Sequence, residues 1–209
     1  AFQMKKIYLI GVDGGTESLR AGVFDHAGVP LAYAATTYAT EFPAPGWAEQ
    51  NPQDWWSALG QSVREAVKKA GIRPDQVTAM TVDTTCCSVV ALDSAGNAVR
   101  PALIWMDVRS AKQAEQLVAT GDAALCINSN GNGPVSAEWM ILKALWIQQN
   151  EPELFDRAFT VCEYQDYLNL HLTGRRVASI NNVASRWHYN RSRGGIPQSL
   201  LKSLDLEAL

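Results

Sequence analysis

The sequence lacks the signatures of a membrane protein, a disulfide scaffold and a metalloprotein. No apolar run approaches the roughly 20 residues of a membrane span, and the N-terminus shows no signal-peptide pattern. The histidines are scattered without an H-E-x-x-H pattern, which argues against a dedicated metal site. The cysteines show no C-x-x-C spacing, and adjacent Cys86 and Cys87 are poorly placed to bridge each other. We therefore expect a cytoplasmic protein with free thiols and no membrane partner.

Strong charge of either sign is also missing. The net charge is −3 over 209 residues, with 47% hydrophobic and 19% charged residues, which is ordinary globular composition for one large domain. Nothing in this balance indicates nucleic acid as a partner. The one basic run, residues 175–193, is interpreted as solvated surface, with a phosphate patch as the alternative. Residues 1–3 precede Met4 and are interpreted as a cloning scar before the native start.

The glycine-rich stretch "LIGVDGGTESLRAGVFD" fits neither common phosphate motif. It has neither the G-x-x-x-x-G-K-[ST] spacing of a P-loop nor the G-x-G-x-x-G of a dinucleotide fold. Apolar runs over 7–12, 19–24 and 29–37 predict three consecutive strands, an antiparallel meander. A Rossmann domain would instead need a helix after its first strand.

The turn between the first two strands carries phosphate-binding chemistry. Asp13 ends a buried strand, where ligands of open α/β sheets collect, and a carboxylate beside phosphate donors suits a bridging Mg²⁺. The glycines allow a tight turn whose N–H groups can form an anion-binding nest. The residues that we predict to hold phosphates or Mg²⁺ are Asp13, Gly14, Gly15, Thr16, Ser18 and Arg20. The alternative is a plain hairpin whose glycines only satisfy turn geometry.

The rest of the chain alternates helices and strands. Pro52 and the apolar spacing of four predict a helix over 52–70, and strands follow over 77–82 and 101–107, the latter delivering Asp107 at its end. Further helices are predicted over 110–119, 136–149 (with Ser136 as its cap), 152–157 and 163–172, a strand over 159–162 and a loop over 121–135. The fold class is α/β, with one mixed sheet that begins with the meander and is flanked by helices.

Five segments in order resemble the FGGY family of carbohydrate kinases. They are "IGVDGGTESLRAGVFD", "PGWAEQNPQDWW", "PALIWMDVRS", "LKALWIQQNEPELF" and "DYLNLHLTGR", and the resemblance runs from about Ile7 to the end of the chain. It implies the N-terminal, sugar-binding domain of an actin-like (ribonuclease H-like) ATPase fold over residues 4–209. It also implies ATP and Mg²⁺ as cofactors, with the opening hairpin as the first phosphate loop and Asp13 contacting the Mg²⁺.

Two stretches, "TVDTTCCSVVALD" and "SAEWMILKAL", are most similar to the ribulokinase-like, pentulose-phosphorylating branch, with Leu142 where proline is usual. The resemblance implies that Lys143 donates to a sugar oxygen. The residues assigned to the sugar are Thr85, Cys86, Cys87, Asp107, Glu138 and Lys143. Each has a structural alternative: the cysteines as small core residues, Lys143 extending to solvent, and Asp107–Arg109 as a surface pair or helix cap.

The resemblance also implies parts that this chain does not contain. The catalytic aspartate, the second phosphate loop and the adenosine pocket are expected beyond Leu209, in a C-terminal domain, so the chain alone is expected to be inactive. Ribulose is the first choice of substrate, and xylulose or a pentitol the second; a homodimer is what the family implies. The alternatives are a sugar- or nucleotide-sensing module on the same fold, and an exopolyphosphatase-like or acetate-kinase-like enzyme.

Overall fold

The computed structural model describes residues 7–127 and 133–208. The cloning-scar interpretation of residues 1–3 and part of the loop predicted over 121–135 fall outside these ranges. The chain divides into two compact units: unit 1 is Ala1–Thr40 with Gln53–Thr85, and unit 2 is Glu41–Pro52 with Cys86–Leu209. Within the described ranges, no helix is both long enough and apolar enough to cross a membrane.

Unit 1 contains a four-stranded mixed sheet in the order β3-β2-β1-β5. The meander consists of β1 (Tyr8–Gly14), β2 (Ser18–Asp25) and β3 (Pro30–Thr37), paired antiparallel as predicted. The fourth strand, β5 (Val77–Thr84), follows the short 3₁₀ helix η1 (Pro74–Gln76) and lies parallel to β1. A parallel pair needs a crossover connection, and a helix supplies it here.

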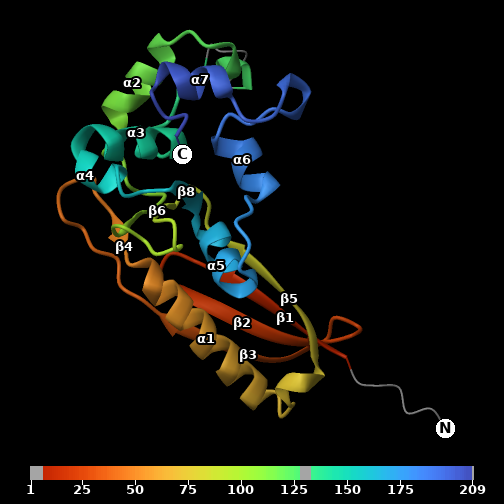
Figure 1. Ribbon diagram of the computed structural model, residues 1–209. Helices are drawn as coiled ribbons and strands as arrows, with labels where there is room; N and C mark the ends of the chain where they lie inside the picture. The colour runs from red at the N-terminus through yellow and green to blue at the C-terminus, as the bar shows by residue number, and fades with distance from the viewer. Residues whose placement is uncertain (1–6, 128–132, 209) are drawn as a thin grey trace. The chain divides into compact units, whose positions relative to one another are not determined.

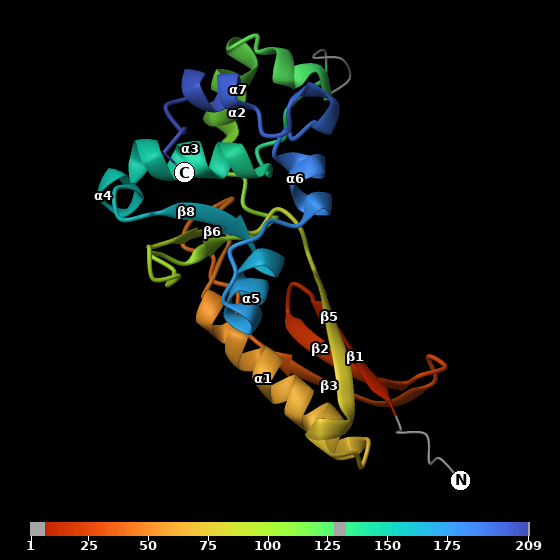
Figure 2. The same cartoon turned by 45° about the vertical axis from the view of Figure 1, so that its right-hand side comes forward.

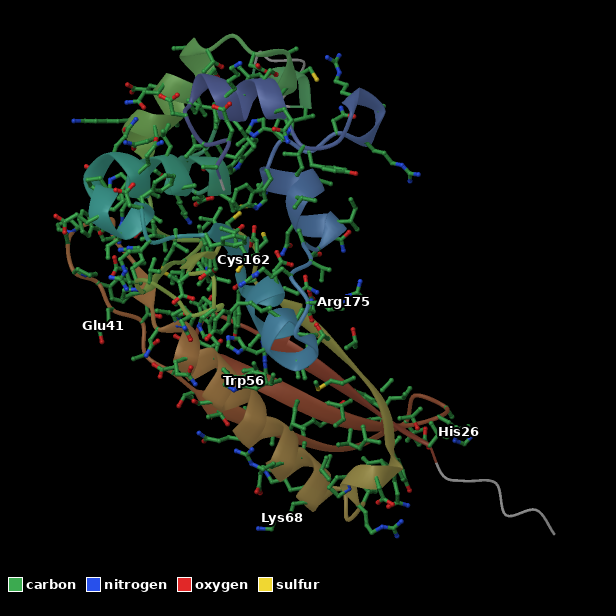
Figure 3. The ribbon with its side chains drawn as sticks, in the orientation of Figure 1. His26, Glu41, Trp56, Lys68, Cys162 and Arg175 are labelled. Atoms are coloured by element: carbon green, nitrogen blue, oxygen red, sulfur yellow. The ribbon has the colours of Figure 1, made fainter. Side chains whose placement is uncertain are left out.

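Helix α1 (Pro52–Lys69) covers one face of this sheet, as both views show (Figure 1 and Figure 2). Its buried positions, Trp55, Ala58, Leu59, Ser62, Ala66 and Val67, recur at helical spacing and confirm the predicted apolar face. The Ser62 hydroxyl donates to the Leu19 carbonyl oxygen at 2.9 Å, which ties the helix to β2. Trp56 and Lys68 mark the two ends of this helix in Figure 3.

Unit 2 contains a second four-stranded sheet in the order β4-β7-β6-β8. Its strands, all antiparallel, are β4 (Glu49–Gln50), β6 (Val89–Leu92), β7 (Ala102–Leu103) and β8 (Thr160–Glu163). The sequence predicted a single mixed sheet, whereas the structure has two sheets. In the second sheet β6 pairs with β8, which lies seventy residues further along the chain. Pairings over such separations leave no local signal in the sequence.

The helices of unit 2 enclose a common core. They are α2 (Ala111–Ala119), η2 (Ala123–Ile127), α3 (Met140–Asn150), α4 (Pro152–Phe155), α5 (Tyr164–Thr173), α6 (Ile180–Arg186), η4 (Arg191–Arg193) and α7 (Gln198–Ser203). Leucines and alanines of α2, α3 and α7 pack in one cluster, and these three helices lie together in both views (Figure 1 and Figure 2). Because all positions of Met140–Ile147 are buried, α3 is the central helix of the unit.

Several predicted elements differ from the observed ones: the helix predicted over 152–157 ends at Phe155, and the loop predicted over 121–135 contains η2. The helix predicted over 136–149 begins at Met140, because the Ser136 hydroxyl and carbonyl accept from the Glu138 and Trp139 N–H groups in a separate turn. The strand predicted over 101–107 is only Ala102–Leu103, and Asp107 follows a turn closed by its N–H on the Ile104 carbonyl at 3.0 Å.

Candidate functional site

The hairpin of unit 1 presents an exposed ion pair. Asp13 and Arg20 face each other in the β1–β2 register, and their side chains meet at 2.7 Å. More than half of each side chain is exposed, at 57% and 58%. An exposed pair of this kind contributes about 0–1 kcal/mol, so either partner can exchange the contact for another ligand at little cost.

Close neighbours leave little room for a side chain at Gly15, and neither Gly14 nor Gly15 adopts a left-handed backbone conformation. Gly14 and Gly15 have no positive φ, and the Gly15 N–H donates to the Ser18 carbonyl at 3.0 Å. The Gly15 N–H is thus engaged within the turn itself, and the anion-binding nest stays a prediction. A Cβ on Gly15 would lie 3.2 Å from Arg20 Nη2 and 3.3 Å from the Ser18 carbonyl oxygen. Half-buried Thr16 and Ser18 line the same turn.

Sequence reasoning missed a second carboxylate beside this hairpin. Asp83 pairs with Asp13 in the parallel β1–β5 register, and both residues are exposed. The signal was available, because the carboxyl ends of parallel strands meet at one edge of a sheet. One or two carboxylates together with phosphate oxygens are what Mg²⁺ takes in nucleotide sites, so this donor set fits the ion. Thr85 lies next to this edge, and its N–H donates to the Gly14 carbonyl at 2.9 Å.

In unit 2, the Lys143 side chain binds the backbone of the loop that contains Cys87. Its side chain is fully buried, and Nζ donates to the Cys87 carbonyl at 2.7 Å and to the Ile104 carbonyl at 2.6 Å. The alternative in which Lys143 extends to solvent is therefore wrong. Burial lowers the pKa of Lys143 to about 8, while nearby acidic groups, Asp107, Glu163 and Glu138 among them, act in the opposite direction. The donation to a sugar oxygen stays a prediction.

The two cysteines of this loop differ in exposure. Cys86 is exposed, whereas Cys87 is 5% exposed and packs against Val89 and Met140. The alternative of a small core residue therefore fits Cys87 but not Cys86. Glu138 is half-buried in the turn before α3. The structure brings the Cys87 carbonyl and Lys143 together, and the contact of this loop with a sugar stays a prediction.

Asp107 lies in a buried ion network. It is fully buried, its Oδ2 accepts from the Ala48 N–H at 2.7 Å, and Arg109 Nη2 lies 2.7 Å from the same oxygen. Arg109 is also paired with Glu49 and stacks on the Trp47 ring, with Cζ 3.8 Å from its centroid. The surface-pair alternative is wrong, and the cap of α2 is Ser110. Asp107 holds this loop in place, and its contact with a sugar stays a prediction.

Glu163 is a buried acid that sequence reasoning did not assign. It ends β8, is fully buried and caps α5 in a capping box with Asp166. Its Oε1 accepts from Trp187 Nε1 at 3.3 Å, and Oε2 has no hydrogen-bond partner. Desolvation, followed by the Asp166 charge, raises the pKa of Glu163 to about 7. Hydrogen bonds from the Cys87 and Ser88 backbone act on that pKa in the opposite direction, so Glu163 lies beside the loop that Lys143 holds.

A cavity of about 260 Å³ in unit 2 lies apart from these residues. Its lining is mainly apolar and comes from β6, α3, β8, α5 and residues 176–206, with Cys162 (Figure 3) and Asp166 among the polar groups. None of the residues predicted to bind sugar or phosphate lines it. Desolvation also raises the pKa of the Cys162 thiol, so this group carries a proton at neutral pH.

Comparisons with known proteins place the fold. A xylulose kinase of solved structure from Rhodospirillum rubrum matches 95% of this chain and 40% of its own, with a TM-score of 0.84 and 28% identity. A xylulose kinase of Lactococcus lactis is 31% identical over 85% of this chain and 35% of its own length. Glycerol kinase 2 of Streptomyces avermitilis is 32% identical over 95% of this chain and 41% of its own length. The fold is thus the actin-like one of sugar kinases.

The family model for the FGGY family of carbohydrate kinases, N-terminal domain, matches residues 8–208. The chain belongs to this family. It spans about two fifths of the length of the relatives described above, from 35% to 41%. The fold class and the family that the five sequence segments indicated are both confirmed.

Proposed function

We propose that this chain is the N-terminal, sugar-binding part of an ATP-dependent kinase that phosphorylates a hydroxyl of a ketopentose. The observation that carries the proposal is the family match over residues 8–208, which includes both the hairpin of unit 1 and the loop supports of unit 2. Phosphoryl transfer depends on positioning and on electrostatic stabilisation of the phosphates, and each unit supplies groups suited to one of these tasks.

Unit 1 supplies the groups for phosphate and Mg²⁺. Asp13 and Asp83 would hold the ion through the nucleotide, and the bound ion would neutralise charge that develops on the transferred phosphoryl group. Thr16 and Ser18 offer hydroxyl groups at the same turn. Arg20 can turn from Asp13 to a phosphate oxygen because their exposed pairing contributes little.

Unit 2 supplies the sugar loop. Cys86 is exposed and Glu138 half-buried, so both offer polar atoms to a ligand, and Glu138 is an acceptor for hydroxyl groups. Lys143 places the loop by binding the Cys87 carbonyl, and its third N–H is available for a ligand oxygen that reaches it. Asp107 and Arg109 hold the neighbouring turn. In this proposal Lys143 acts first as a positioning group.

The acceptor is proposed as a ketopentose on two grounds. The stretches around Cys86 and Lys143 resemble the ribulokinase-like branch, and the relatives include xylulose kinases. The name of the glycerol kinase relative makes glycerol the alternative. Epimeric sugars differ only in the placement of hydrogen bonds, so the two ketopentoses are separate arms of the test.

The test is a substrate panel with the full-length kinase. ADP release would be measured with xylulose, ribulose, glycerol and gluconate, with each enantiomer of the two ketopentoses run separately. We expect kcat/KM for one ketopentose to exceed that for glycerol by at least about 100-fold, since a site built for specific hydroxyls rejects an analogue that lacks them. Preference for glycerol would contradict the substrate, and no turnover with any polyol or sugar would contradict the kinase.

The catalytic aspartate and the adenosine site are proposed to come from the remainder of the full-length protein. Under this proposal the 209-residue chain has no measurable turnover, whereas the full-length protein reaches the roughly 1–100 s⁻¹ typical of kinases. A cytoplasmic location remains a prediction that cell fractionation would check, and a homodimer remains a prediction that gel filtration would check.

A further inference from the structure

Two sulfur atoms touch at the end of the predicted sugar loop. Cys86 Sγ and Cys87 Sγ are 3.8 Å apart, in consecutive residues of unit 2. Cys86 is exposed to solvent, and Cys87 is buried behind it. The pair therefore offers one thiol for encounter with a reagent and a second thiol directly beside the first.

Three features of Cys87 fix the position of its sulfur atom: its backbone conformation, a hydrogen bond to its carbonyl and the packing of its side chain. Cys87 has a φ of +64°, a left-handed conformation that side chains other than glycine rarely adopt. Its carbonyl accepts the 2.7 Å hydrogen bond from Lys143 Nζ, and its side chain packs against Val89 and Met140. Surrounding contacts must hold such a conformation, so the two sulfurs are presented side by side without any rearrangement.

The spacing favours chelation over a disulfide. Two sulfurs bound to one bridging atom through bonds of about 2.3 Å lie roughly 3.3 Å apart at a pyramidal centre such as As(III) and roughly 3.8 Å apart at a tetrahedral one. A disulfide requires about 2.0 Å between sulfurs, and Cα atoms at least about 4.4 Å apart, whereas consecutive Cα atoms are about 3.8 Å apart. Closing the bond would thus strain the loop that Lys143 holds, while a bridging atom fits the distance already present.

The site offers two sulfur ligands, and this number decides which kind of atom could bridge them. Residues 7–127 and 133–208 contain no group of three or more His, Cys, Asp or Glu side chains suited to a metal ion. A zinc ion would need about four such ligands. A trivalent organoarsenical keeps its carbon substituent and needs only two sulfurs.

We propose that Cys86 and Cys87 form a vicinal dithiol site that binds trivalent organoarsenicals through both sulfurs. With an arsenoxide R–As=O, two As–S bonds form, the arsenic–oxygen bond breaks, and both thiol protons leave with the oxygen as one water molecule. No atom changes oxidation state, so no oxidant or reductant is needed. The exposed Cys86 adds first, and Cys87 closes the ring by passing its proton to the departing hydroxyl group.

The reactivity of the inner thiol agrees with this order. Desolvation, with Cys86 as the next contribution, raises the pKa of Cys87 to about 12, so it carries a proton at neutral pH. A thiolate-dependent attack by Cys87 is therefore slow. The ring-closing step instead transfers its proton to a leaving group held beside it.

Binding at this site has a consequence that rests on the proposed function. If the loop that carries Cys86 contacts the sugar, the bridged arsenic and the sugar exclude each other. The arsenical would then raise the KM for the sugar and leave the KM for MgATP unchanged, because Asp13 and Arg20 belong to unit 1.

The test uses phenylarsine oxide with the 209-residue chain and intact-mass spectrometry. We expect one arsenical per chain, retained against excess monothiol and removed by a dithiol such as dithiothreitol. Cys86→Ser and Cys87→Ser should each weaken binding by about 100-fold or more, because the second sulfur acts at a high effective concentration. Cys126→Ser is the matched control and should bind as the unaltered chain does.

Two outcomes would overturn the dithiol proposal, and a third tests the proposed sugar loop. Equal retention by the Cys86→Ser chain, or complete loss of the adduct to a monothiol, would overturn it. Because Cys86 is exposed, its serine variant should keep its fold, and circular dichroism would confirm this; the result is then decisive even if Cys87→Ser does not fold. In the full-length kinase, arsenical binding without protection by sugar would contradict the proposed sugar loop and leave the dithiol site standing.

Discussion

Two aspartate–arginine ion pairs have the same nitrogen–oxygen distance but differ in exposure to solvent. Asp13–Arg20 of unit 1 and Asp107–Arg109 of unit 2 both meet at 2.7 Å. The first pair is more than half exposed, and the second is 0% and 1% exposed. Burial, and not distance, separates an ion pair that can change partners from one that cannot. The comparison assigns ligand exchange to the hairpin and loop support to the buried pair.

The largest effect is expected from breaking the buried pair. Arg109→Met leaves Asp107 as a buried acid without an arginine and leaves Glu49 with Arg100 alone, and it should lower the free energy of unfolding by about 3–5 kcal/mol. Urea denaturation of the 209-residue chain measures it. Adding Asp107→Asn should recover part of the loss, because the stranded charge is then removed. A loss below about 1 kcal/mol would show that the network is not the support described above.

The next effect is a pH dependence from Glu163. Its folded pKa of about 7 lies above the ordinary value of 4.5, so the stability it contributes is complete below pH 4.5 and is lost as pH rises through 7. Glu163→Gln lacks this slope. Between pH 4.5 and pH 8 the stability difference should therefore move by about 3 kcal/mol in favour of the variant.

The groups facing Glu163 set the control for that experiment. They are Asp166, Lys143, Cys87 and Cys162, and Asp166 also has a raised pKa through desolvation. Asp166→Asn should reduce the slope and not abolish it, because the main cause of the Glu163 shift is burial. Parallel stability curves for the unaltered chain and Glu163→Gln would contradict the account.

A smaller effect is expected from filling the hairpin. Gly15→Ala places a methyl group 3.2 Å from Arg20 Nη2 and 3.3 Å from the Ser18 carbonyl oxygen, and should lower stability by about 1 kcal/mol. In the full-length kinase it should raise the KM for MgATP more than the KM for sugar. Gly11→Ala, in the strand that leads into this turn, is the matched control, since its Cβ meets only Phe24 at 3.4 Å. Equal effects of both variants would remove the special role of Gly15.

The smallest effect on stability is expected from the exposed pair. Arg20→Ala should change the free energy of unfolding by at most about 1 kcal/mol, because solvent already screens its contact with Asp13. Urea denaturation under the conditions used for Arg109→Met gives the direct contrast. A loss as large as that of Arg109→Met would end the distinction between the two pairs.

The sequence predicted most of the local structure correctly. Alternating and helical periodicities located β1, β2, β3 and α1 to within two residues of the observed bounds, since these elements depend on neighbours in the chain. The start of α3 was missed because Ser136, a good cap by type, closes a turn of its own. The second sheet was missed because its strands pair across long separations.

The candidate site shows the same division. Asp13, Gly15 and Arg20 could be predicted because one short hairpin contains them all. Asp83 was missed although a parallel pairing of its strand with the first one would have indicated it. Glu163 could not be predicted, because its role follows from burial. The sequence did not decide whether Lys143 extends to solvent or contacts a ligand. Its two hydrogen bonds to backbone carbonyls could be seen only in the fold of unit 2.

The most direct measurement is the turnover of the full-length kinase with Asp13→Asn, compared with Glu17→Gln in the same hairpin. Both variants remove one exposed carboxylate, and neither should change stability by more than about 1 kcal/mol. We predict that Asp13→Asn lowers kcat by about 100-fold or more, since metal stabilisation of the transferred phosphoryl group contributes several kcal/mol. Glu17→Gln should retain ordinary turnover. Equal turnover of the two variants would contradict the assignment of this hairpin to the nucleotide.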